Sequence, residues 1–124
     1  MARLTRVVAV AAPLLVASLA LSSCGVGGAV TDARASCVFV HRALALQARS
    51  DAPGISPGEQ NRLQANALSE LLKGTQPAAD ATSADGSWNP LETTINEAER
   101  VPMQNLVPAL TRLCKVANSQ SPYL

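Results

Sequence analysis

Hydrophobic residues recur every three or four positions through most of the chain, a spacing that gathers them on one side of an α-helix. Thr31 or Asp32 is suited to cap a first helix, and Pro53 and Gly54 follow its end. Its apolar stripe contains Ala33, Cys37, Val40, Leu44 and Ala48, widened by Phe39, Ala43 and Leu46. The pattern predicts an amphipathic helix over residues 32–50.

A second helix is predicted from Ser56 to Gly74. Ser56-Pro57-Gly58-Glu59 has the form of a capping box with proline at the first helical position. The apolar positions cover a wide arc: Leu63, Ala67, Leu68, Leu71 and Leu72. A helix with this much apolar surface must pack against two neighbours or against a partner.

Residues 75–88 are rich in alanine and in small polar residues, and they include Pro77 and Gly86. We interpret them as a long connection that has room for one helical turn. Such a loop is unusual in a small domain, which makes it a place to look for function.

Two further helices are predicted after this connection, over residues 89–98 and about 104–118, with Val101-Pro102 between them. Pro108 lies in the first turn of the second of these helices or kinks it. In the first of these helices the residues expected to face inward are Leu91, Ile95 and Ala98. In the second they are Val107, Leu110, Cys114 and Ala117, with Leu106 and Leu113 beside them. No alternating strand pattern is present. The prediction is an all-α, four-helix up-down bundle over residues 32–118, followed by a tail at 119–124.

The N-terminus has a different pattern. Arg3 and Arg6 precede an uncharged, largely apolar run from residue 7 to residue 21, as in a secretory signal. A membrane-spanning helix needs ~20 apolar residues, so this run is short. Beyond Leu21 the neutral stretch turns into serine and glycine, which form helix poorly.

Leu21-Ser22-Ser23-Cys24 closes this run and resembles the lipobox of bacterial lipoproteins. The resemblance implies that residues 1–23 are a cleaved signal peptide and that Cys24 becomes a lipidated N-terminus carrying acyl chains such as palmitate. It implies a protein anchored to the extracytoplasmic face of a cell membrane. Residues 24–31 then read as a flexible tether. The alternatives are a simple cleaved signal and an uncleaved anchor.

The size, charge and aromatic content of the mature chain argue against some classes of function. The mature chain is long enough for one domain with a modest core. It keeps all nine acidic residues and eight of the ten basic ones, because Arg3 and Arg6 leave with the signal, so its net charge is −1. This balance argues against nucleic-acid binding through a basic surface. Phe39, Trp88 and Tyr123 are the only aromatic residues, too few for a platform that stacks sugars or bases.

Cys37 and Cys114 remain as the only thiols once Cys24 is lipidated. An even pair in an exported chain predicts one disulfide. The first and last helices of an up-down bundle are antiparallel, which brings the start of one beside the end of the other. Two buried free thiols or a redox pair are the alternatives, although a redox pair is usually closely spaced.

Gly54-Ile55-Ser56-Pro57-Gly58 matches G-x-S-x-G, the turn that holds the nucleophile of α/β-hydrolases. That turn follows a strand, whereas a predicted helix precedes this segment. The residue after the serine must donate its backbone N–H to the oxyanion hole, and Pro57 has none. The single histidine, His41, also precedes Ser56 instead of following it. Ser56 is therefore predicted to cap a helix.

No metal site or cofactor is predicted. His41 has no histidine or cysteine partner at zinc-ligand spacing, and we expect a boundary residue without a catalytic role. No spacing requires a haem held by His41 with Tyr123 or Met103. Glu97 and Glu99 point in different directions on a helix and are expected to be solvated.

These observations predict a non-catalytic accessory or interaction protein, held on the membrane through Cys24 and associated with a membrane protein complex. The alternative is a binding module for an apolar ligand such as a lipid or haem, with the leucine arc of the second helix lining its pocket. Trp88 lies in the connection expected at the membrane-proximal end of the bundle. It is a candidate contact with the membrane or a partner, the alternative being that it plugs the end of the core.

Overall fold

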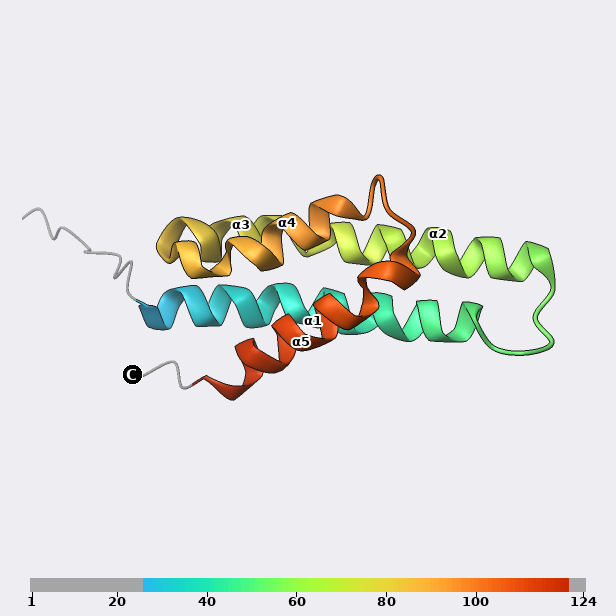
Figure 1. Cartoon of the computed structure of the whole chain (residues 1–124), viewed down its shortest axis with the longest axis horizontal. Coiled ribbons are helices and arrows are strands. Elements are labelled where there is room, and N and C mark those ends of the chain that lie inside the picture. The colour runs from blue at the N-terminus through green and yellow to red at the C-terminus, as the bar shows by residue number, and fades with distance from the viewer. Residues whose placement is uncertain (1–25, 121–124) are drawn as a thin grey trace, which may run out of the picture.

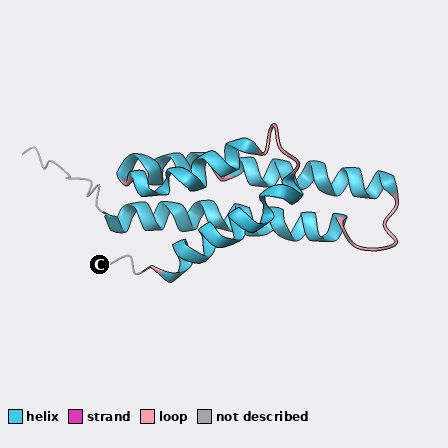
Figure 2. Cartoon of the chain, in the orientation of Figure 1, coloured by secondary structure: helices cyan, strands magenta, loops and turns pink. Residues whose placement is uncertain are grey.

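The computed structural model of the chain describes residues 26–120, and all regular structure in this range is helical (Figure 2). Its elements are α1 (Val26–Ser50), α2 (Pro57–Lys73), α3 (Thr75–Ala84), the short 3-10 turn η1 (Gly86–Trp88), α4 (Asn89–Glu97) and α5 (Met103–Ser119). The α2 and α3 helices follow one another along α1, α4 returns, and α5 runs back obliquely beside α1 (Figure 1). The predicted four-helix up-down bundle with one disulfide is confirmed, with α2 and α3 together forming its second arm.

The first helix begins earlier than predicted, at Val26. Residues 26–31 are therefore part of α1, and the expected tether over 24–31 is wrong from residue 26 onward. Ala29 and Val30 are buried in the core, at 0% and 1% exposure. Their burial against the other helices offsets the weak helix propensity of the neighbouring glycines.

The buried side of α1 also differs from the predicted stripe toward the end of the helix. Ala43 and Gln47 face inward, whereas Leu44 is half-buried and Ala48 is exposed. The Gln47 amide nitrogen donates to Asp51 Oδ1 at 3.0 Å, which satisfies the buried polar group. The buried side of this last part of α1 thus includes a polar residue that the periodicity of apolar residues does not reveal.

Residues 75–88, expected as a connection, form α3 and η1 instead. Pro77 lies in the first turn of α3, where its missing N–H costs no hydrogen bond. Ala78 and Ala81 are fully buried, and Gln76 bonds to Asp80 one turn later. The alanines that suggested a loop are the residues that allow α3 to pack closely on α1.

Gly74 marks the junction between α2 and α3 and lies against α1. The Ser36 hydroxyl, which is buried, donates to the Gly74 carbonyl oxygen at 2.8 Å. A Cβ at Gly74 would lie 3.0 Å from Ser36 Oγ and 3.1 Å from the Leu71 carbonyl oxygen. The predicted end of the second helix at Gly74 is confirmed, and the close approach to α1 explains why glycine is needed there.

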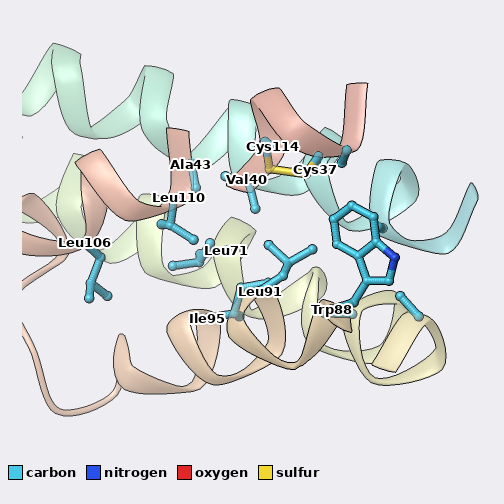
Figure 3. Close-up of a cluster of buried hydrophobic side chains, with 14 of the residues drawn as sticks. Cys37, Val40, Ala43, Leu71, Trp88, Leu91, Ile95, Leu106, Leu110 and Cys114 are labelled. Atoms are coloured by element: carbon cyan, nitrogen blue, oxygen red, sulfur yellow. A yellow bond between two sulfur atoms is a disulfide. The ribbon is translucent and has the colours of Figure 1, made fainter. Parts of the chain in front are cut away.

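The core runs between all five α-helices, with α2 contributing Leu71, and Figure 3 shows its central side chains. Leu71, Leu91, Ile95 and Leu110 are its large members, all at 0% exposure. In α5 the inward positions are Leu106, Leu110, Cys114 and Ala117, whereas Val107, expected inside, is only half-buried. Small alanines fill much of the remaining contact with α1.

The Cys37–Cys114 disulfide predicted from the sequence is present, joining α1 to α5 across 77 positions of the chain. Near it, Arg34 of α1 donates from Nε to the Ala117 carbonyl oxygen at 2.9 Å and from its guanidinium to the Gln120 carbonyl oxygen. A cation at the carboxyl end of a helix satisfies free carbonyls and complements the helix dipole. A covalent and an electrostatic link thus hold the end of α5 against the start of α1.

Removal of the disulfide by the double substitution Cys37→Ala and Cys114→Ala should lower the free energy of unfolding by up to about 4 to 5 kcal/mol, because the unfolded chain regains the entropy of a long closed loop. Urea unfolding followed by circular dichroism measures the change. Reductant should destabilise the wild type and leave the double variant unaffected. A double variant as stable as the oxidised wild type would contradict the prediction.

Gly74→Ala should destabilise the bundle by roughly 1 to 3 kcal/mol, because its Cβ crowds Ser36 and the Leu71 carbonyl. Gly58→Ala is the matched control, since a Cβ there meets nothing within 4 Å. It should be neutral or slightly stabilising in the same urea titration. Equal losses in the two variants would show that close packing at Gly74 is unimportant.

Candidate functional site

The residues singled out in the sequence do not form one site. Cys24 lies outside the described residues, and α1 begins two positions after it in the chain. Cys37 and Cys114 are joined in the core. Ser56, His41 and Trp88 belong to different parts of the bundle, so each is described in turn.

Trp88 is buried, with 4% of its surface exposed. Figure 3 shows its ring at one end of the labelled core residues, with the indole nitrogen on the side away from them. Asp85 caps η1 by accepting the Ser87 backbone N–H at 3.0 Å, a bond that also lowers the pKa of the Asp85 carboxyl, and this turn directs Trp88 inward. The expected contact of Trp88 with a membrane or partner has little surface to support it. The packing agrees with the alternative, in which the ring plugs the core.

Ser56 caps α2, as predicted. Its backbone is extended and its hydroxyl accepts the Glu59 backbone N–H at 3.3 Å. The Glu59 carboxylate does not complete a reciprocal capping box but accepts hydrogen bonds from Arg62, which hold its pKa below the ordinary value. Ser56 is thus occupied by a structural bond at the start of a helix.

The remaining candidates are surface residues. His41 and Glu99 are exposed, and Glu97 forms an ion pair with Arg100 on the next turn. Tyr123 lies outside the described residues. Within residues 26–120 no group of three or more histidine, cysteine or acidic side chains is placed to hold a metal ion. None of the described helices is both long enough and apolar enough to cross a membrane.

A groove that the sequence did not reveal lies where α1, α2 and the turn between α4 and α5 meet. Its volume is about 430 Å³. The lining residues are Gln47 from α1; Asn61, Gln64, Ala65 and Leu68 from α2; and Ala98, Val101, Pro102, Met103 and Gln104 from the turn and the start of α5. We call this the amide groove, because four of these side chains end in amides.

Each part of the amide groove has a local cause. Asn61, Gln64, Ala65 and Leu68 lie three or four positions apart, so α2 presents them on one side. Pro102 precedes α5 with φ −52° and ψ 131°, an extended conformation that breaks the helix and turns Met103 and Gln104 toward α2. The Val101-Pro102 interruption was visible in the sequence, but its position opposite α2 is a property of the fold.

The chemistry of the amide groove is polar but uncharged. Gln47 is 3% exposed and donates hydrogen bonds from its amide nitrogen to the Asp51 carboxylate. Leu68, Val101 and Met103 are half-buried and supply apolar surface. Amide side chains both donate and accept hydrogen bonds, as a peptide backbone does. The lining therefore matches an uncharged ligand with amide-like groups and offers no charge to an ionic substrate.

Comparison with known families, curated proteins and solved structures finds no match to this chain. The function must therefore be inferred from its own residues.

Trp88→Ala should cost roughly 3 to 5 kcal/mol of stability, because it empties the end of the core. Trp88→Phe should cost less than about 1.5 kcal/mol, since it keeps an aromatic ring and removes an indole N–H that is buried without a hydrogen-bond partner. Urea unfolding compares the two variants. Near-wild-type stability of Trp88→Ala would mean that the ring is free for another role.

Proposed function

We propose that this protein is an exported lipoprotein, anchored to the extracytoplasmic face of a membrane through Cys24, that acts as a non-catalytic interaction subunit of a membrane protein complex. The amide groove is the surface that binds the partner. Its preferred ligand is an uncharged, extended segment of that partner, held by hydrogen bonds between peptide groups and the amides of Asn61, Gln64 and Gln104.

The anchor is supported by the lipobox-like residues before Cys24 and by the disulfide. Disulfides persist in oxidising compartments such as the periplasm or the cell surface, and they are rare in the cytosol. Export past the cytoplasmic membrane accounts for both features.

The amide groove is the observation that carries the interaction role. Ligand sites are usually concave and partly apolar with a few well-placed polar groups, and the amide groove has this composition. A ligand carrier would instead need the leucine arc of α2 to line a pocket. Leu63 and Leu71 are buried at 2% and 0% exposure, so most of that arc is used to hold α2 in the bundle.

A photocrosslinking amino acid at position 64, in the amide groove, should capture a specific membrane protein in intact cells. The same amino acid at position 66, exposed on α2 but outside the groove, should not. Ala65→Glu should abolish the crosslink from position 64, because it places an unpaired charge in an uncharged groove. Mass spectrometry identifies the partner and the crosslinked segment.

Cys24→Ser tests the anchor in the same cells and should leave an unprocessed precursor or release the protein from the membrane fraction. Equal crosslinking from positions 64 and 66, or crosslinking that persists in Ala65→Glu, would refute the groove as the partner site. A Cys24→Ser protein that is processed and still membrane-bound would refute the lipid anchor.

A further inference from the structure

The side of α1 that faces away from the core combines basic and apolar residues. Its exposed positions from residue 35 onward are Ala35, Val38, His41, Arg42, Ala45, Ala48 and Arg49, which we call the outer face of α1. None of these residues is acidic. Val38 is 48% exposed, and it is one of two large apolar side chains exposed among the described residues, the other being Val116. Basic residues interleaved with apolar ones are typical of helices that lie on a membrane surface.

A shallow depression of about 370 Å³ lies on this outer face, lined by Arg42, Ala45, Leu46, Arg49 and Glu70. Arg42 and Arg49 lie two helical turns apart, on either side of Ala45 and Leu46. The Arg42 guanidinium lies over the Phe39 ring, 5.7 Å from the ring centre. This cation–π contact favours one position of the Arg42 side chain. Glu70 pairs with Lys73 through Oε1, and within the described residues its buried Oε2 has no hydrogen-bond partner. Two arginines against this one carboxylate leave the depression with an excess of positive charge.

Within residues 26–120, Arg42 and Arg49 form no salt bridge, whereas Arg62, Lys73 and Arg100 are each paired on their own helix. Glu59 lies within Coulombic reach of Arg49 but is hydrogen-bonded to Arg62.

The charges of the bundle are also divided between its sides. The α1 and α5 helices carry five basic residues and one acidic residue, whereas α3, η1 and α4 carry only acidic ones.

The two sets of helices lie on opposite sides of the molecule (Figure 1). An anionic surface would therefore attract the α1 and α5 side and repel the α3 and α4 side. The division of charge gives the bundle a preferred orientation on such a surface.

The position of the anchor distinguishes two orientations. Because α1 begins two positions after Cys24, Val26 lies within about 7 Å of the lipidated residue. If α1 stood upright, Arg42 would be roughly 24 Å farther from the bilayer, beyond the Debye length of about 8 Å at physiological salt. If α1 lies flat, Arg42 and Arg49 both meet the headgroups.

We propose that the outer face of α1 lies flat on an anionic lipid surface, with the depression between Arg42 and Arg49 binding the phosphate of a headgroup and Val38 entering the interface. This proposal rests on the lipid anchor proposed above. Gln47 is the α1 residue that lines the amide groove. It lies roughly 140° to 180° around the helix axis from Val38, Arg42, Ala45 and Arg49. The amide groove therefore opens away from the membrane. The orientation therefore leaves the groove open to a partner.

The test uses the lipidated, oxidised protein in vesicles of phosphatidylcholine, alone or mixed with phosphatidylglycerol. A fluorophore is attached through Ala48→Cys on the outer face or, as the matched control, through Asn96→Cys, which is exposed on α4. Quenchers attached to lipid headgroups should reach the label at position 48 in vesicles containing phosphatidylglycerol and should not reach it at position 96. Arg42→Gln combined with Arg49→Gln should reduce the ratio of flat to upright protein about thirtyfold, since each arginine near an anionic surface contributes a factor of about five.

Flotation of the vesicles separates the two proposals. Protein that does not float with the vesicles shows that the anchor fails. Two results for protein that floats would overturn the flat orientation and leave the anchor standing. One is equal quenching of the labels at positions 48 and 96. The other is quenching at position 48 that stays the same after both arginines are replaced. Quenching at position 48 that high salt reduces supports contact with the headgroup charge.

Discussion

The contact between α1 and α5 is the constraint on which the rest of the structure depends. The Cys37–Cys114 disulfide joins the two helices, and Arg34 holds the last carbonyls of α5 against the start of α1. All of α2, α3 and α4 lies inside the loop that this bond closes. A domain of this size buries a limited apolar area, so a covalent closure supplies stability that a larger core would otherwise provide.

The shape of the bundle follows from the small residues that meet α1. Ala78 and Ala81 of α3 are fully buried, and Gly74 approaches Ser36 closely enough to accept its hydroxyl hydrogen bond. Small side chains allow helix backbones to come near each other, which raises the number of favourable van der Waals contacts without large aromatic residues. Trp88 is the exception, filling the end of the core beyond the reach of these alanines.

The α1–α2 pair presents two different surfaces. On its inner side, together with the α4–α5 turn, it forms an uncharged groove lined by amides. On its outer side it exposes Arg42 and Arg49 around an apolar depression. The proposed interaction with a partner and the proposed contact with lipid use opposite sides of the same two helices, so neither blocks the other.

Local sequence patterns were enough to predict the helical class, the cap at Ser56, the end of α2 at Gly74, the break at Val101-Pro102 and the pairing of Cys37 with Cys114. These features depend on local backbone preferences and on the antiparallel arrangement of the first and last arms. Lipidation at Cys24 stays a prediction, because that residue lies outside the described range. Packing between helices is needed to explain why residues 75–84 are helical, why α1 extends back to Val26 and why Trp88 faces inward. In each case burial against a distant helix outweighs a weak or ambiguous local preference. The amide groove belongs to the same class, since its lining comes from segments that become neighbours only after the bundle has closed.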